Sequence, residues 1–99
     1  LGYALSEELL YDDRGRPLNG NLLDYKLPTS MDTPKLQAEF VEIEDPTGPF
    51  GNKALGEPPA IPVAPAIRNA VLHATGVAVD SLPLSPQKLV KCFKEAGLI

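Results

Sequence analysis

Cysteine and histidine are almost absent from this chain, and their scarcity excludes two kinds of site. Cys92 is the one cysteine, so an internal disulfide cannot form. His73 is the one histidine, and together the two residues are too few for a zinc site built from protein ligands. No metal ligand is therefore predicted, and the absence of a disulfide framework favours a cytoplasmic protein.

Clusters of basic residues are also missing. The chain has 9 Lys and Arg residues against 13 Asp and Glu residues, which gives a formal net charge of -4. Proteins that bind nucleic acid or an anionic membrane gather Lys and Arg side chains into a patch. We therefore expect neither nucleic acid nor membrane among the partners of this chain.

Long apolar runs are lacking as well. A membrane-spanning helix needs about 20 consecutive apolar residues, and a secretory signal combines a basic start with a shorter apolar run. The chain begins "LGYALSEELL", with no initiator Met and already inside a patterned apolar segment. This opening suggests a fragment of a longer protein, in which Leu1 to Leu5 form the last turns of a helix.

Apolar residues, proline and glycine are what the chain does contain. Its 99 residues are 43% hydrophobic, enough for one modest core in a single domain. The 11 prolines and 8 glycines exceed average usage. This excess predicts long connecting segments that rest on something else.

A dense group of turn residues near the start predicts a β-hairpin. In the arm that follows, Leu23 and Tyr25 alternate with Asp24 and Lys26, which is the period of a half-buried strand. Each residue of the turn group favours a turn through a local hydrogen bond, a fixed φ or tolerance of positive φ. The group consists of Asp12, Asp13, Gly15, Pro17, Asn19 and Gly20.

A further strand is predicted after the proline-containing stretch "PTSMDTPK". Pro28 and Pro34 each remove a backbone donor there and disfavour helix in the residue before them. The next ten letters, "LQAEFVEIED", alternate apolar and polar residues. The alternation changes phase between Phe40 and Val41, which is typical of a bulge.

Two amphipathic helices are predicted at the end of the chain. Apolar residues recur every three or four positions over about 63–75 and 86–96. Gly76 suits the end of the first helix, and Ser85 with Pro86 suits the start of the second. Ile67 lies on the apolar face of the first helix and Phe93 on that of the second. Both faces are expected to pack on a sheet.

The predicted fold class is therefore α+β, with antiparallel strands, a hairpin plus a further strand, followed by two helices. The strand-rich part is 6–45, the loop that holds the candidate active-site residue is 48–61, and the helical part is 62–97.

Several polar residues could carry chemistry, but most have an ordinary explanation. An acidic run in the further strand would point to both faces of the strand, so a solvated surface is favoured over a metal site. His73 suits a favourable contact with a helix C-terminus better than a role as a base. Cys92 is expected to be a small buried hydrophobe. The acidic run consists of Glu39, Glu42, Glu44 and Asp45.

Glu57 has a different setting, between Gly56 and the pair Pro58-Pro59. Glycine lets another group approach the main chain, and the prolines are expected to hold a rigid, extended segment. A general base needs such a fixed position, and apolar surroundings raise the pKa of a carboxylate. From the residues alone, a hydrogen-bonded Glu in a proline-rich turn remains an alternative, and the favoured one.

The segment "GPFGNKALGEPPAIPVAPAIRNAVLHATG", followed by "LPLSPQKLV", resembles the C-terminal end of a known enzyme subunit. That subunit is the molybdenum-binding subunit of the xanthine dehydrogenase and aldehyde oxidoreductase family of molybdenum hydroxylases. The upstream "LGYALSEELLYDDRGRPLNGNLLDYKLPTSMDTP" also resembles the segment before the Gly-Glu-Pro motif of that family. The resemblance covers essentially the whole chain, and it implies that residues 1–99 are a C-terminal fragment of a molybdopterin-binding catalytic domain.

In this family the glutamate of the Gly-Glu-Pro motif is the active-site base, and here that residue is Glu57. The resemblance implies that Glu57 removes the proton from a hydroxide on molybdenum. The oxygen, which comes from water, then attacks an electron-poor carbon of a heterocycle or aldehyde while hydride passes to a sulfido ligand. Lys53 and Gly56 belong to the same motif, and no cofactor contact is assigned to either.

The resemblance also implies cofactors and partners. The full enzyme would hold a molybdenum-pterin cofactor, with iron-sulfur clusters and usually FAD in other domains or subunits. The expected partners are the remainder of the molybdenum-binding subunit, those electron-transfer parts and a small-molecule substrate. The chain alone is expected to bind no cofactor, to be inactive and to self-associate through exposed surface.

Two alternatives remain open. One is a non-catalytic interaction module that packs against a pterin-binding subunit. The other, a free-standing small enzyme, is the weaker of the two, because one base without nucleophile, metal or cofactor offers no complete mechanism.

Overall fold

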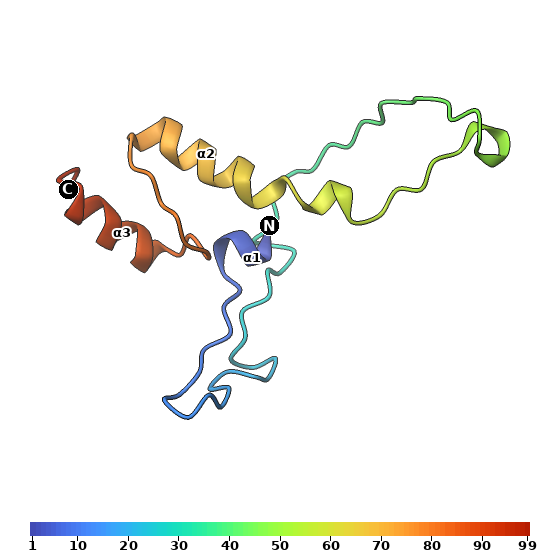
Figure 1. Cartoon of the computed structure of the whole chain (residues 1–99). Coiled ribbons are helices and arrows are strands. Elements are labelled where there is room, and N and C mark those ends of the chain that lie inside the picture. The colour runs from blue at the N-terminus through green and yellow to red at the C-terminus, as the bar shows by residue number, and fades with distance from the viewer.

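Helices are the only regular elements of the chain. The computed structural model describes residues 1–99. The elements are α1 (Gly2–Leu5), two short 3₁₀ turns, η1 (Pro49–Gly51) and η2 (Pro58–Ala60), then α2 (Val63–Thr75) and α3 (Pro86–Glu95). Two long arms leave the helical part, one between α1 and about residue 28, the other between about residue 33 and η2 (Figure 1).

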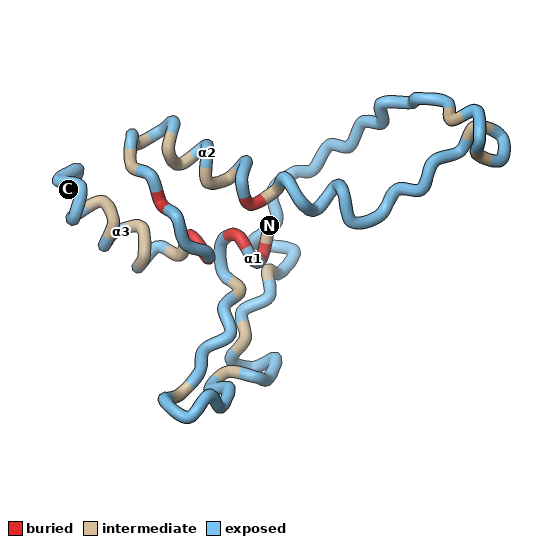
Figure 2. The backbone as a smooth tube through the Cα atoms, in the orientation of Figure 1, coloured by how far each residue is buried: buried red, intermediate tan, exposed pale blue.

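The chain is extended and encloses little. Its radius of gyration is 18.2 Å, whereas a compact domain of this length has a value of about 13 Å. Only 6 of the 99 residues are buried, and the apolar ones are Ala4, Ala64, Val79 and Leu84. These buried positions lie where α1, the start of α2 and the segment before α3 come together, while both arms are mostly exposed (Figure 2).

The two C-terminal helices form at the predicted residues, because their start and stop signals are local. α2 ends at Gly76, which adopts φ 73° and ψ 0°, a left-handed conformation that carries no Cβ penalty in glycine. α3 begins after Ser85, whose Oγ accepts a hydrogen bond from the N–H of Lys88 at 3.4 Å. Pro86 occupies the first position of α3, where a backbone donor is not needed.

The predicted α+β class is wrong, because the chain contains no strand. Where the hairpin was predicted, one isolated antiparallel bridge joins Tyr11 and Pro17. Beside the bridge, the N–H of Leu18 donates to the carbonyl of Leu10 at 2.8 Å. The ladder stops there because the side chain of Asn19 takes the next main-chain groups: its Oδ1 accepts from the N–H of Leu10 at 2.7 Å, and its Nδ2 donates to the carbonyl of Glu8 at 2.7 Å.

The second arm of the predicted hairpin forms a side-chain-supported turn instead. Oδ1 of Asn21 accepts hydrogen bonds from the N–H groups of Leu23 at 3.0 Å and Asp24 at 3.1 Å. Such local hydrogen bonds compete with strand formation. The alternating apolar pattern is overridden here, and Leu23 is 83% exposed.

The further strand predicted over 36–45 is absent as well. Residues 34–44 have no hydrogen bond between their main chain and any other main-chain group of this chain. A strand is defined by its ladder, and alternation in the sequence does not supply a partner. The helices consequently pack on no sheet, and Ile67 and Phe93 are half-buried rather than core residues.

The turn at the tip of the first arm is expected to depend on pH. Oδ1 of Asp12 accepts from the N–H groups of Arg14 and Arg16, each at 2.9 Å, and Oδ2 accepts from Nε of Arg16 at 2.8 Å. These hydrogen bonds, that of the Arg16 backbone first, lower the pKa of Asp12 below its ordinary value of 3.8. Their contribution is therefore present above pH 3.8 and is lost as the pH falls through the lowered pKa.

An NMR titration checks this prediction. The Asp12 carboxyl should titrate with a midpoint below 3.8, and the amide signals of Arg14 and Arg16 should shift in the same step. Arg16→Gln removes the guanidinium and leaves the backbone donor. The pKa of Asp12 should therefore rise only part of the way back to its ordinary value. A wild-type midpoint at or above 3.8 contradicts the prediction.

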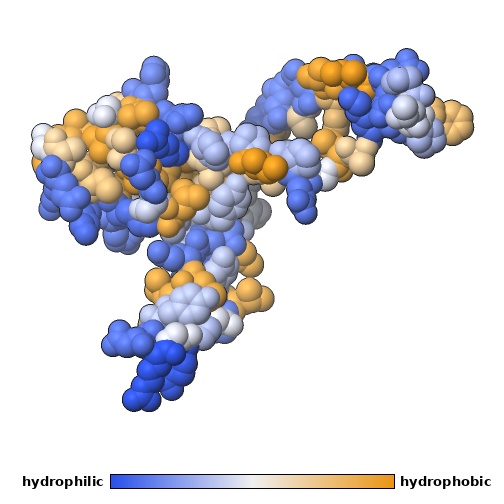
Figure 3. Space-filling model, in the orientation of Figure 1, coloured by the Kyte–Doolittle hydropathy of each residue, from blue (hydrophilic) through white to orange (hydrophobic).

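The arms expose apolar side chains, and the isolated chain is expected to self-associate. Orange, apolar groups lie on the outer surface of both arms (Figure 3). Soluble monomers rarely leave large contiguous apolar patches uncovered. Sedimentation should show oligomers, together with strong binding of an apolar dye; a strict monomer that binds little dye contradicts the expectation. The most exposed large apolar residues include Leu22, Leu23, Met31, Val41 and Phe50.

None of the helices combines the length and the apolar character that crossing a membrane would require.

Candidate functional site

Glu57 lies at the junction between the second arm and α2. It directly precedes η2, with φ -58° and ψ -37°. Its carbonyl accepts the N–H of Ala60 at 2.9 Å, and the carbonyl of Pro58 accepts the N–H of Ile61 at 3.3 Å. The pair Pro58-Pro59 thus begins a 3₁₀ turn rather than the extended segment predicted from the sequence. Both conformations suit the fixed φ of proline, and the hydrogen bonds of Ala60 and Ile61 select the turn.

The side chain of Glu57 is free within this chain. The residue is exposed, and its carboxylate takes part in none of the four ion pairs. No side-chain hydrogen bond involves it either, so the alternative of a hydrogen-bonded Glu in the turn has no partner in this chain. Both carboxylate oxygens are available to a group that lies outside these residues.

The neighbours of Glu57 leave the main chain open. A Cβ added at Gly56 would meet no atom within 4 Å, so a group from outside the chain can approach the backbone there. Leu55, Ile61 and Lys53 are exposed. The apolar residues on either side of Glu57 therefore form no enclosed pocket by themselves.

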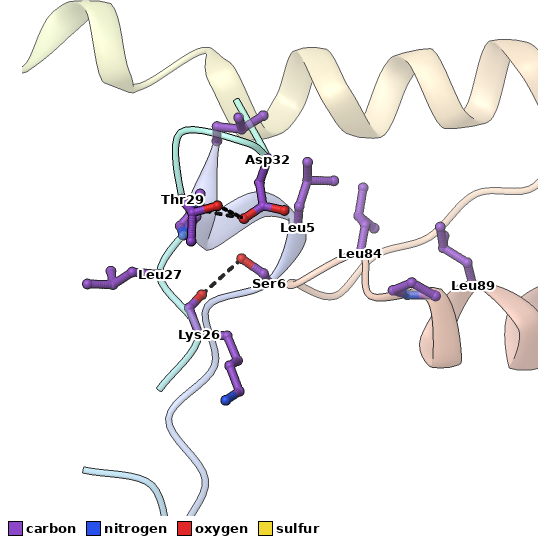
Figure 4. Close-up of a pocket in the computed structure, with 11 residues that line it drawn as sticks. Leu5, Ser6, Lys26, Leu27, Thr29, Asp32, Leu84 and Leu89 are labelled. Carbon is purple, nitrogen blue, oxygen red and sulfur yellow. Dashed lines mark hydrogen bonds between the residues drawn. The ribbon is translucent and has the colours of Figure 1, made fainter. Parts of the chain in front are cut away.

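α1 ties this junction to the rest of the molecule. The hydroxyl of Tyr3 donates to the carbonyl of Ala60 at 2.9 Å. The carbonyl of Ala4 accepts the N–H of Leu84 at 2.7 Å. Oγ of Ser6 donates to the carbonyl of Lys26 at 3.1 Å (Figure 4). The sequence predicted a helix at this place, but Tyr3 was not singled out, because no local signal reveals a contact 57 residues away.

A groove of about 650 Å³ lies beside α1, and Glu57 does not line it. Its polar side chains are already paired: Oδ2 of Asp32 accepts from the N–H of Thr29 at 2.8 Å and from its Oγ1 at 2.7 Å (Figure 4). The groove therefore offers mainly apolar surface, and it is separate from the candidate base. The labelled lining residues are Leu5, Ser6, Lys26, Leu27, Thr29, Asp32, Leu84 and Leu89.

The other residues considered from the sequence do not form a site. Nowhere in the chain do three or more His, Cys, Asp or Glu side chains gather in a way that could hold a metal ion. In the acidic run, Oδ1 of Asp45 accepts from the N–H of Thr47 at 2.9 Å and from its Oγ1 at 2.7 Å. These hydrogen bonds, the backbone one first, lower the pKa of Asp45. His73 is exposed in the last turn of α2, and Cys92 is a half-buried free cysteine on α3.

Comparison with known proteins finds similarity to molybdopterin-dependent enzymes. Residues 1–34, which include α1 and the first arm, match the family model of the molybdopterin cofactor-binding domain. Across its whole length the chain is 56% identical to the putative xanthine dehydrogenase molybdenum-binding subunit of Escherichia coli (strain K12) over 100 residues, which are 13% of that protein. Over its whole length the chain is thus similar to one segment of a molybdenum-binding subunit.

Other molybdenum-binding subunits and related proteins share the similarity. The aldehyde oxidoreductase molybdenum-binding subunit of Escherichia coli (strain K12) is 39% identical over 92 residues, which are 91% of this chain and 13% of that subunit. The 6-hydroxypseudooxynicotine dehydrogenase complex subunit gamma of Paenarthrobacter nicotinovorans is 37% identical over 92 residues, or 90% of this chain and 12% of that protein. The chain thus spans only about an eighth of the length of these relatives.

Proposed function

We propose that this chain is part of a molybdopterin-dependent oxidoreductase, to which it contributes Glu57 as the general base. The reaction would be hydroxylation of a heterocycle or aldehyde carbon with oxygen from water. The observation that carries the proposal is the placement of Glu57 on a proline-braced turn, with its carboxylate exposed and unbonded. The similarity to xanthine dehydrogenase and aldehyde oxidoreductase subunits supports the class of reaction.

The residues present suit a cofactor that is held mainly by the rest of the subunit. The chain has no cluster of metal ligands, so it would not supply the ligand set of a metal. It does offer a carboxylate with free acceptor oxygens, next to the open space at Gly56. Such an arrangement fits a proton acceptor that faces a group bound by other residues.

When bound, a molybdenum-pterin cofactor supplies a metal that acidifies coordinated water and takes up electrons. Glu57 then needs only moderate basicity, because the metal has already lowered the pKa of the proton donor. What the chain must provide is position, and η2 provides it through two prolines of fixed φ and the hydrogen bond from Ala60 to Glu57.

The extended arms support a role inside a larger assembly. Their exposed apolar side chains have no cover within the chain, and the remainder of the molybdenum-binding subunit is the partner that we infer for them. Iron-sulfur and flavin domains or subunits would carry the electrons away, and a relative named as the gamma subunit of a dehydrogenase complex is consistent with such an assembly. The chain on its own would be inactive, and the assembly would act in the cytoplasm on a small-molecule substrate.

The deciding experiment is anaerobic reduction of the Glu57→Gln holoenzyme by its substrate. A strong loss of rate with the cofactor retained supports the general base. Reduction at the wild-type rate favours instead the second candidate, a non-catalytic module whose arms only pack against a pterin-binding subunit. That candidate is supported by the same exposed arms and assigns no chemical role to Glu57.

A further inference from the structure

A tyrosine on α1 reaches across the molecule to the turn that follows Glu57. The hydroxyl of Tyr3 donates a hydrogen bond to the carbonyl of Ala60 at 2.9 Å, and the two residues are 57 positions apart in the chain. Ala60 is the last residue of η2. Two segments that share no local sequence signal are thus joined by a single polar contact.

Ala60, which accepts the hydrogen bond from Tyr3, lies one 3₁₀ turn after the candidate base Glu57. The N–H of Ala60 donates to the carbonyl of Glu57 at 2.9 Å and so closes the turn. The carbonyl of the same residue accepts the hydrogen bond from Tyr3. Pro58 and Pro59 lie between Glu57 and Ala60, and their rings fix φ at both positions. Because the turn has so little freedom, a displacement of Ala60 is passed on to Glu57.

α1 is a firm support for this contact. Ala4, the neighbour of Tyr3, is 0% exposed. Its carbonyl accepts the N–H of Leu84 at 2.7 Å, and α1 contacts α2. Figure 2 shows α1 at the centre of the small buried cluster, whereas η2 lies on the exposed path of the second arm. Tyr3 is itself 41% exposed, but its main chain belongs to this anchored helix, from which its hydroxyl supports an otherwise exposed turn.

We propose that Tyr3 is a positioning residue for Glu57: its hydroxyl holds η2 in place through the carbonyl of Ala60, and so fixes the main chain from which the Glu57 side chain extends. The inference rests on the proposed role of Glu57 as a base. The physical reason is that catalysis by a proton acceptor depends on geometry, and a misplacement of about 1 Å can lower a rate by about 100-fold. Tyr3 touches neither substrate nor cofactor in this role.

The test is Tyr3→Phe in the complete holoenzyme, with Tyr11→Phe as the matched control. The hydroxyl of Tyr11, on the exposed first arm, makes none of the hydrogen bonds of the chain. The rate of anaerobic single-turnover reduction, normalised to molybdenum content, should fall by about 3- to 10-fold in Tyr3→Phe, the range for one lost neutral hydrogen bond. The Kd of the substrate and all properties of Tyr11→Phe should stay at wild-type values.

Amide hydrogen exchange gives a readout that is independent of activity. In a peptide covering residues 56–62, Pro58, Pro59 and Pro62 carry no amide hydrogen, and the first two residues lose their label during digestion. The retained deuterium therefore reports Ala60 and Ile61, the two donors of η2. Exchange of this peptide should be about 3- to 10-fold faster in Tyr3→Phe, and unchanged in Tyr11→Phe.

The double variant separates positioning from a general structural effect. If Tyr3 acts through Glu57, Tyr3→Phe should lower the rate little further once Glu57→Gln is present. If Tyr3→Phe lowers the reduction rate by the same factor with Glu57 and with Glu57→Gln, the inference is overturned. It is also overturned if the single variant Tyr3→Phe changes neither the rate nor the hydrogen exchange. A wild-type reduction rate in Glu57→Gln overturns the proposed function. The role of Tyr3 in positioning a base is then overturned as well. If only the inference about Tyr3 is wrong, Glu57→Gln still reduces slowly. The two negative outcomes are therefore distinguishable.

Discussion

Replacing Glu57 with Gln in the complete enzyme is expected to slow substrate-driven reduction by roughly 10² to 10⁴, the contribution of a general base. The substitution keeps the shape and volume of the side chain and removes the basic oxygen. In this chain Glu57 is exposed and has no ion pair, so the change disrupts no internal contact. Molybdenum and pterin content should consequently stay near wild type.

Substrate binding should change far less than the rate, because a base acts mainly in the transition state. The measurement is anaerobic single-turnover reduction of the purified, fully metallated variant, which separates chemistry from the exit of electrons. Glu42→Gln is a matched control, since Glu42 is also exposed, lies in the acidic run of the second arm and should leave the rate unchanged. A wild-type rate in Glu57→Gln would remove Glu57 from the mechanism.

Leu84→Ala is expected to lower the free energy of unfolding of the isolated chain by about 2 to 5 kcal/mol. Leu84 is 2% exposed and is the largest fully buried side chain. The other buried apolar residues are small, and Ala4 and Ala64 have no long side chains that could move into the cavity. The backbone hydrogen bond from Leu84 to the carbonyl of Ala4 is kept in this variant, so the expected loss comes from the buried side chain.

Urea denaturation followed by circular dichroism of α2 and α3 measures this loss. Leu22→Ala is the matched control: Leu22 is 80% exposed, and its truncation should change stability by less than about 0.5 kcal/mol. If Leu84→Ala is already unfolded without urea, the result agrees with the expectation. Equal and small effects of the two substitutions would mean that the cluster around Leu84 is not the core.

Some elements of this protein could be predicted because their causes are local. α2 and α3 carry their own start and stop residues, and Gly76, Ser85 and Pro86 act through conformations and hydrogen bonds within one helical turn. Glu57 could likewise be singled out from its glycine and proline neighbours. The chemistry assigned to it came from a resemblance, since neighbours alone do not distinguish a base from a surface carboxylate.

The strands could not be predicted correctly, because a strand depends on a partner. The alternation in 36–45 describes which faces would be apolar, yet residues 34–44 find no main-chain partner in this chain. In the first arm, the side chains of Asn19 and Asn21 bind main-chain groups, and one isolated bridge is all that forms. Periodicity is a necessary condition for a half-buried strand and not a sufficient one.

The sequence by itself determined the two C-terminal helices, the place of Glu57 between glycine and proline neighbours, and the similarity to molybdenum-binding subunits. The tertiary structure alone decided that the Glu57 carboxylate is exposed and that Tyr3 holds Ala60 from 57 residues away. The reason lies in the range of the interactions. Helix caps and fixed φ angles act between residues that are close in sequence, so the sequence reveals them. Burial and distant hydrogen bonds exist only once the chain has folded back on itself.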